Sequence, residues 1–271
     1  MNAICVESLQ FSYGRQQVLN GVTFSVRRGE MVFVLGKNGA GKSTLFKCIL
    51  GHIKKAGGAI EIAEAPLESY NPRALAKRVA YIPQAGAPTY NYTVRQMVTM
   101  GRTVHLPPFS SPTKKDDAIV SEALERMDIL ELAEKGFDEI SGGERQLALI
   151  ARALVQQGNI LLMDEPTSNL DYGNQLRVLQ RVKALTGSGL TVLVTSHNPQ
   201  HALHFGDRVL ALEGGAVRAF GAPKDVLEPG LVRALYGIDV EFSRHGEEIV
   251  ILPRLNGEQK SDAGASFPVG D

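Results

Sequence analysis

The chain has 271 residues, enough for one or two domains and a large core. Its 29 basic and 29 acidic residues give a formal net charge of +0, which argues against binding nucleic acid through a basic surface. The two cysteines, Cys5 and Cys48, are isolated, so they indicate neither a disulfide framework nor a metal knuckle. No signal peptide and no apolar run of ~18 residues is visible, so we expect a cytosolic chain that works at a membrane only through other subunits.

The first segments, 3–9 and 18–26, are expected to be strands. In the second, Val22, Phe24 and Val26 alternate with polar residues, as in a half-buried strand. Tyr13 lies between the two segments and could stack on an adenine base. Packing at a strand edge explains this tyrosine equally well.

A glycine-rich segment follows the apolar run 31–35 and precedes an expected helix that starts at Thr44. The segment reads Gly36-Lys37-Asn38-Gly39-Ala40-Gly41-Lys42-Ser43. Strand, loop and helix are the context that the G-x-x-x-x-G-K-[ST] phosphate loop requires. Lys42 would reach the β- and γ-phosphates, and the Ser43 hydroxyl would bind Mg²⁺. An ordinary glycine-rich turn is the competing interpretation, and the flanking strand and helix count against it.

The next expected strands are 59–63 and 79–82. Gln84 follows the second of them, at the kind of strand end where α/β sheets place ligand-facing groups. A solvated loop amide is the commoner explanation for a glutamine considered alone. From Thr93 to Ile140 the pattern changes from strands to helices, which indicates a helical insertion.

The next helix starts with Ser141-Gly142-Gly143-Glu144. Ser-x-x-Glu is a capping box, which is a sufficient structural explanation for the serine and the glutamate. Two glycines in a first turn lower helix stability, however, so a phosphate that approaches this helix N-terminus is a second explanation.

A fully apolar strand, 160–163, ends in Asp164 and Glu165. Asp164 can hold Mg²⁺, and Glu165 can polarise an attacking water as a general base. The alternative for Glu165 is a charge at a helix start, since Pro166 suits a first helical position. Asp171 ends the segment 168–171, which caps a long helix.

The buried strand 190–195 is followed by His197, at the position that a γ-phosphate sensor would need. A lone histidine is usually structural. Beyond it, 208–213 and 216–220 predict a hairpin, 231–236 a helix, and 240–242 and 248–252 two strands. The polar, glycine-rich residues 256–271 are expected to be disordered.

Taken in order, these motifs resemble those of the nucleotide-binding subunit of ATP-binding-cassette (ABC) transporters over residues 3–236. The matches are Tyr13 to the adenine-stacking aromatic, Gly36–Ser43 to Walker A, Gln84 to the Q-loop, Ser141–Glu144 to the signature, Ile160–Asp164 to Walker B, Glu165 to the catalytic glutamate, Ser168–Asp171 to the D-loop and His197 to the switch histidine. Two departures occur: the signature has Glu144 where Gln is commoner, and the D-loop has Asn169 where Ala is usual.

The resemblance implies an α/β fold with a P-loop NTPase core, an antiparallel β subdomain, a helical insertion subdomain and a small C-terminal α/β extension. The ATPase domain would span 1–236 with the insertion at about 88–157, followed by the extension at 237–255 and the tail at 256–271. The implied enzyme is an ATPase that uses ATP and Mg²⁺. Its catalytic residues would be Glu165, His197 and Gln84; its nucleotide-binding residues Tyr13, Gly36, Lys37, Asn38, Gly39, Ala40, Gly41, Lys42, Ser43, Thr44, Ser141, Gly142, Gly143, Glu144 and Asp171; and its metal-binding residues Ser43, Gln84 and Asp164.

The resemblance also implies partners: a second copy in a head-to-tail ATP-sandwich dimer, two membrane-spanning permease subunits and, indirectly, an external substrate-binding protein, but no nucleic acid. The chain would lie at the cytoplasmic face of the membrane. The strings at 93–95, 100–102 and 170–175 look like the importer branch for iron–siderophore, haem and cobalamin uptake. A molybdate- or tungstate-type importer ATPase is an alternative, and so is a soluble cassette ATPase that acts on DNA or ribosomes.

Overall fold

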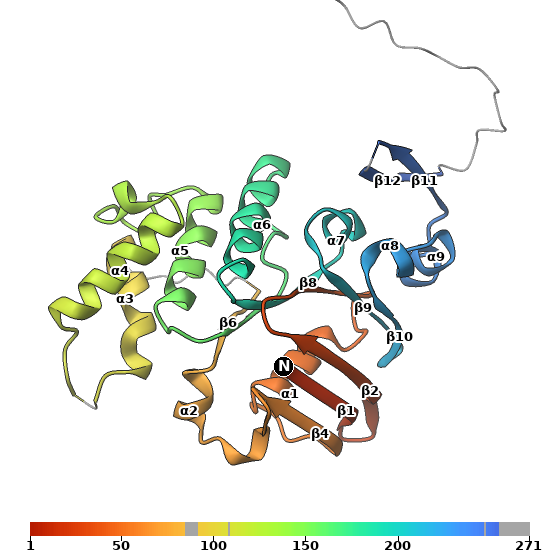
Figure 1. The fold of residues 1–271 in the computed structure, drawn as a ribbon, viewed down its shortest axis with the longest axis horizontal. Coiled ribbons are helices and arrows are strands. Elements are labelled where there is room, and N and C mark those ends of the chain that lie inside the picture. The colour runs from red at the N-terminus through yellow and green to blue at the C-terminus, as the bar shows by residue number, and fades with distance from the viewer. Residues whose placement is uncertain (85–91, 108, 247, 255–271) are drawn as a thin grey trace, which may run out of the picture.

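The structure is a computed structural model that describes residues 1–84, 92–107, 109–246 and 248–254. Two β-sheets lie at the centre, with a group of helices on one side and a small hairpin at the C-terminal end (Figure 1). Within the described ranges, none of the helices has both the length and the apolar character needed to cross a bilayer.

The larger sheet has six strands in the order β10-β9-β3-β8-β7-β6. The strands from β9 to β6 run parallel, and β10 pairs antiparallel with β9. Strands of a parallel sheet are buried on both faces, which explains why β3 and β7 are apolar at every position. The strands are β3 (Met31–Leu35), β6 (Val79–Ile82), β7 (Ile160–Met163), β8 (Thr191–Ser196), β9 (Arg208–Glu213) and β10 (Ala216–Gly221).

The smaller sheet is antiparallel, and helix α1 (Lys42–Ile49) packs between the two sheets (Figure 1). Leu45 and Phe46 of α1 share one hydrophobic core with Val32 and Val34 of β3 and with the inner face of the smaller sheet. The loop that joins β3 to α1 is therefore held by both sheets. The strands are β1 (Asn2–Tyr13), β2 (Gln16–Arg27), β4 (Gly57–Ile62) and β5 (Ala65–Pro66), in the order β2-β1-β4-β5; η1 (Leu67–Ser69) and α2 (Pro72–Ala76) follow.

The other face of the larger sheet is covered by helices that form a second core. Thr93, Thr113 and Ser141 each start a helix with a complete capping box. A buried ion pair of 2.8 Å between Arg102 Nε and Asp116 Oδ1 joins two of these elements. The elements are α3 (Val94–Thr99), η2 (Met100–Val104), α4 (Lys114–Arg126), η3 (Leu130–Leu132), α5 (Gly142–Leu154), α6 (Tyr172–Thr186) and α7 (Pro199–Phe205).

A small C-terminal unit packs on α7 through a glutamine side chain. Gln200 Nε2 donates to the Ile249 carbonyl at 2.8 Å, and the Ile251 N–H donates to Gln200 Oε1 at 2.9 Å. The amide thus extends the edge of the C-terminal hairpin. The unit contains α8 (Pro223–Val226), α9 (Pro229–Tyr236), β11 (Val240–His245) and β12 (Glu248–Pro253).

The predicted α/β class is confirmed, and so are the strands and helices expected in the C-terminal part. The helix start considered at Pro166 is wrong: the chain turns after β7, and α6 begins only at Tyr172, behind the N-cap Asp171. The expected boundary near residue 88 and the expected disorder of 256–271 concern residues outside the described ranges.

Candidate nucleotide site

The loop between β3 and α1 ends in a glycine that no other residue could replace without strain. Gly41 has a φ of 100°, and a Cβ added there would lie 2.8 Å from Leu19 Cδ2. Helix α1 has no side-chain N-cap and no acidic residue in its first turn, whereas Thr93, Thr113 and Ser141 cap three other helices. The N-terminus of α1 is therefore suited to an anion, which would satisfy its first N–H groups.

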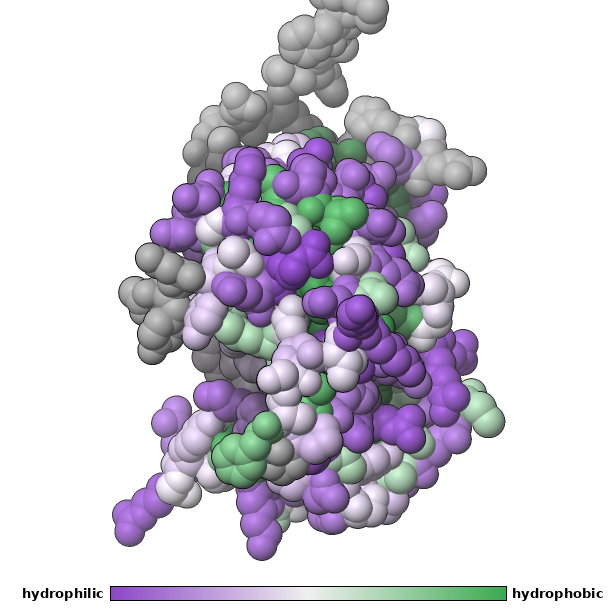
Figure 2. Space-filling view, turned by 90° about the vertical axis from the view of Figure 1, so that its left-hand side faces the viewer, coloured by the Kyte–Doolittle hydropathy of each residue, from purple (hydrophilic) through white to green (hydrophobic). Residues whose placement is uncertain are grey.

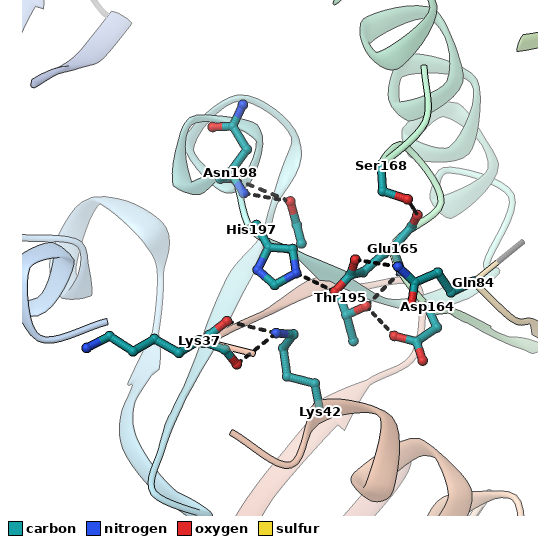
Figure 3. Close-up of polar contacts among 11 residues, drawn as sticks. Lys37, Lys42, Gln84, Asp164, Glu165, Ser168, Thr195, His197 and Asn198 are labelled. Atoms are coloured by element: carbon teal, nitrogen blue, oxygen red, sulfur yellow. Dashed lines mark hydrogen bonds and ion pairs between the residues drawn. The ribbon is translucent and has the colours of Figure 1, made fainter. Parts of the chain in front are cut away.

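Lys42 lies in this loop as a buried cation, 5% exposed. Its Nζ donates to the carbonyl oxygens of Gly36 at 2.8 Å and Lys37 at 3.2 Å (Figure 3). Burial lowers the pKa of Lys42, while the negative charges of Glu165 and Asp164 act in the opposite direction. The ammonium group is thus held by the loop carbonyls, within the electrostatic influence of two carboxylates.

Polar side chains from the ends of three parallel strands meet at one carboxylate (Figure 3). Gln84, after β6, donates from Nε2 to Glu165 Oε2 at 3.0 Å. His197, after β8, contacts Glu165 Oε1 through Nε2. The carboxyl ends of parallel strands share one edge of the sheet, so residues distant in sequence converge there. The structure thus brings together the three residues that the sequence predicted as catalytic.

Asp164 is 4% exposed and is held by a residue that the sequence reasoning missed. Thr195 Oγ1 donates to Asp164 Oδ1 at 2.7 Å and accepts from the Glu165 N–H at 2.8 Å. The available signal was a hydroxyl directly after the apolar run Val192–Val194, near the end of β8.

Two oxygen donors near Lys42 fit Mg²⁺. Among the described residues, no group of three or more His, Cys, Asp or Glu side chains could hold a metal ion. Mg²⁺ commonly uses one or two protein oxygens together with substrate phosphates and water. The buried Asp164 and the exposed Ser43 hydroxyl, next to Lys42, are donors of that kind.

The predicted signature residues form a second cluster, at the start of α5. The Ser141 N–H donates to Glu144 Oε2 at 2.7 Å, and the Glu144 N–H donates to Ser141 Oγ at 3.3 Å. The Ser141 side chain and then its N–H, as hydrogen-bond donors to the carboxylate, lower the pKa of Glu144. Ser141 and Gly142 are exposed, and Gly143 is buried. No hydrogen bond or ion pair in the described part of the chain joins Ser141 or Glu144 to the phosphate loop.

The other predicted nucleotide-binding residues have mixed surroundings. Tyr13 ends β1, is 48% exposed and packs edge-on against Phe11 at 4.7 Å between ring centroids. About half of this residue is therefore accessible to solvent. Asp171 caps α6, and its Oδ1 accepts from the Asn174 N–H at 2.8 Å. In the phosphate loop, Lys37, Asn38 and Gly39 are exposed, Gly36 and Ala40 are buried, and Thr44 is half-buried.

A hollow of about 740 Å³ lies on the side of α2, at the junction with the helical part. The segment after α1 contributes His52 to its wall, and Tyr81 of β6 contributes to the same wall. Val104 and Gln156 close it from the helical side. The hollow is therefore lined by residues from the sheet and from the helical part of the chain.

Comparison with known proteins places this geometry in a family. The profile of the ABC transporter family matches residues 19–168. The hemin import ATP-binding protein HmuV of Pseudomonas aeruginosa is 39% identical over 247 residues, 89% of this chain and 95% of the relative. The cobalamin import ATP-binding protein BtuD of Halobacterium salinarum is 36% identical over 232 residues, 85% of this chain and 58% of the relative.

Solved structures agree with these relatives. A chain of a transporter classed as metal-chelate type, in an inward-facing conformation, has a TM-score of 0.83 and 30% identity, and the match covers 94% of this chain and 99% of that one. The chain described here belongs to the ABC transporter family. It is an ATP-binding ATPase subunit of that family, with the predicted P-loop NTPase core.

Proposed function

We propose that this chain hydrolyses ATP to power the import of a metal chelate of the iron–siderophore, haem or cobalamin class through separate membrane subunits. The observation that carries the proposal is the convergence of Gln84, Glu165 and His197 at one sheet edge. The buried Lys42 of the phosphate loop lies within the electrostatic influence of Glu165. The hemin- and cobalamin-import relatives and the metal-chelate transporter support the substrate class.

Phosphate binding is assigned to Lys42 and the N-terminus of α1. The ammonium group of Lys42 already points into the loop, where two carbonyl oxygens accept hydrogen bonds from it. A triphosphate replaces these weak acceptors with charged oxygens, which form stronger hydrogen bonds. Mg²⁺ would neutralise phosphate charge and would be held by Ser43, Asp164 and Gln84.

The role of accepting the proton of the attacking water is assigned to Glu165. Gln84 holds one oxygen of its carboxylate, and His197 contacts the other. These contacts orient the carboxylate, and a carboxylate so placed can accept a proton as general base. His197 is 40% exposed at its side chain, so it can reach a γ-phosphate that enters from outside.

The second cluster is assigned to a site completed by another copy of the chain. Ser141 and Gly142 are exposed at the N-terminus of α5, where an anion would be favoured. In a head-to-tail dimer this helix end would face ATP on the partner's phosphate loop, and Asp171 would lie at the same interface. Closure of that dimer on ATP and its reopening after hydrolysis would drive transport.

The hollow beside Tyr81 is assigned to the membrane subunit. Its wall combines residues from the sheet and from the helical part of the chain. A segment bound there would therefore be displaced if these two parts moved relative to each other. Figure 2 views the side that carries α3 and α4 and shows a mostly hydrophilic surface with small, separate hydrophobic patches. From the import ATP-binding relatives we assign the chain to the cytoplasmic face of the membrane, with an external binding protein that delivers the chelate.

The central test is Glu165→Gln. This variant keeps the side-chain size and a hydrogen-bonding oxygen for Gln84, but it cannot accept a proton. We expect ATP hydrolysis by the full chain to fall by about 10²–10⁴-fold, with ATP binding retained. Glu125→Gln on the exposed face of α4 is the matched control. Normal hydrolysis by the Glu165 variant would remove the base assignment.

The substrate class needs a separate test. The chain would be co-purified with its membrane subunits and reconstituted in proteoliposomes, with a ferric siderophore, hemin and cyanocobalamin as probes. We expect ATP-dependent uptake of one of them, abolished by the Glu165→Gln variant. Uptake of molybdate instead would overturn the metal-chelate assignment and leave the ATPase assignment intact.

A further inference from the structure

Thr195 is a fully buried polar residue, the last but one of β8, with 0% exposure. The three residues before it, Val192–Val194, are apolar and also fully buried. A hydroxyl in such a position requires hydrogen-bond partners, because an unpaired one would be costly to bury. Both partners of Thr195 belong to the segment that follows the neighbouring strand, β7.

A single hydroxyl bridges Asp164 and Glu165 (Figure 3). Thr195 Oγ1 donates its proton to Asp164 Oδ1 at 2.7 Å, and it accepts the Glu165 N–H at 2.8 Å. The hydroxyl proton can point in only one direction, so the donor role is committed to Asp164. Because Thr195 is neutral, it orients this carboxylate without cancelling its negative charge. A divalent cation needs that negative charge in order to bind.

The backbone explains why a side chain is needed at this point. Met163 pairs with Val194 in the parallel ladder, and the Asp164 N–H donates to the Ile82 carbonyl of β6 at 2.9 Å. Glu165 then leaves the sheet with a φ of 48°, a conformation that is uncommon for residues other than glycine. The Thr195 hydroxyl binds the N–H of this residue and so holds the turn that directs the Glu165 side chain.

We propose that Thr195 is a positioning residue for ATP hydrolysis, which sets the orientation of the Asp164 carboxylate and the backbone turn at Glu165. This inference rests on the proposed roles of Asp164 in holding the metal and of Glu165 in accepting the proton. Thr195 does not touch the reacting atoms; it acts through both of these residues with one hydroxyl group.

The chain offers a matched set of variants. Thr195→Val removes the hydroxyl and keeps the shape, and Thr195→Ser keeps the hydroxyl and removes the methyl group. Thr191→Val is the control, since Thr191 is 1% exposed on the same strand and its Oγ1 accepts from the Gly29 N–H at 3.1 Å, away from both carboxylates. All three would be made in the full chain.

Two readouts are needed: kcat and KM for ATP hydrolysis, and Mn²⁺ affinity in the presence of a non-hydrolysable ATP analogue, measured by electron paramagnetic resonance. For Thr195→Val we expect kcat to fall at least about tenfold and Mn²⁺ binding to weaken several-fold, with KM for ATP changed by less than about twofold. Thr195→Ser should restore both quantities to within about threefold of the wild type, and Thr191→Val should leave both unchanged.

Three results would overturn the proposal: wild-type kcat and Mn²⁺ affinity in Thr195→Val, equal losses in Thr191→Val, or failure of Thr195→Ser to restore the losses. Glu165→Gln measured in parallel separates the two levels of inference. If that variant hydrolyses ATP normally, the proposed base is wrong whatever Thr195 does. The Mn²⁺ readout still tests whether the Thr195 hydroxyl orients Asp164.

Discussion

Gly143 in the first turn of α5 provides a sharp test of how the chain packs around its second cluster. A Cβ added to Gly143 would lie 2.5 Å from Asn174 Oδ1 and 2.6 Å from its Cγ. The Asn174 side chain cannot easily turn away, because its Nδ2 donates to Asp171 Oδ2 at 2.8 Å. We therefore expect Gly143→Ala to lower the free energy of unfolding by about 1–3 kcal/mol through overpacking.

Asn174→Ala should relieve the clash. It removes Oδ1 and Cγ and leaves only Cβ, 3.1 Å from the added methyl group, a gap that small adjustments can widen. In that background Gly143→Ala should cost almost nothing, since alanine is favoured over glycine in a helix by up to about 1 kcal/mol. The double-mutant cycle should thus give a coupling energy of about 1–3 kcal/mol.

The assay is urea unfolding followed by circular dichroism, because the chain has no tryptophan to report by fluorescence. Gly142→Ala is the control: its Cβ would meet only Leu170 Cδ2, at an ordinary 3.4 Å. The reasoning is refuted if Gly143→Ala costs the same with and without Asn174, or if Gly142→Ala costs as much. A stable Gly143→Ala/Asn174→Ala double variant that lacks hydrolysis would show that the nucleotide also needs bare backbone there.

Two further predictions concern buried charge. Lys42→Ala should weaken ATP binding at least about tenfold in titration calorimetry, with the exposed Lys47→Ala as control, and unchanged affinity would contradict the phosphate-loop assignment. Burial, and then the nearby His204, lower the pKa of His201 below its usual 6.5, so the folded chain binds fewer protons than the unfolded chain. The free energy of unfolding should therefore fall as pH drops below about 6.5, and it should fall less in His201→Leu. Urea unfolding at several pH values checks this, and an equal pH dependence in the two proteins would contradict it.

The features that the sequence predicted best depend on chemistry within a few neighbouring residues. The phosphate loop was recognisable because its glycines, Lys42 and Ser43 lie between an apolar strand and a helix. The capping box of Ser141 and Glu144 has both predicted hydrogen bonds. The helix start considered at Pro166 was wrong for a related reason. Proline permits a helix start, but no local rule says whether the chain turns first.

The sequence by itself thus determined the strands of the larger sheet, the loop that suits a phosphate and the type of each predicted site residue. Only the tertiary structure decided which of them meet, because contacts such as His197 with Glu165 span 32 positions and depend on the parallel register of β7 and β8. The same register places the Thr195 hydroxyl between Asp164 and Glu165, and packing of α5 on α6 sets Asn174 against Gly143. These residues follow no local pattern, so only the packing of the strands and helices reveals their roles.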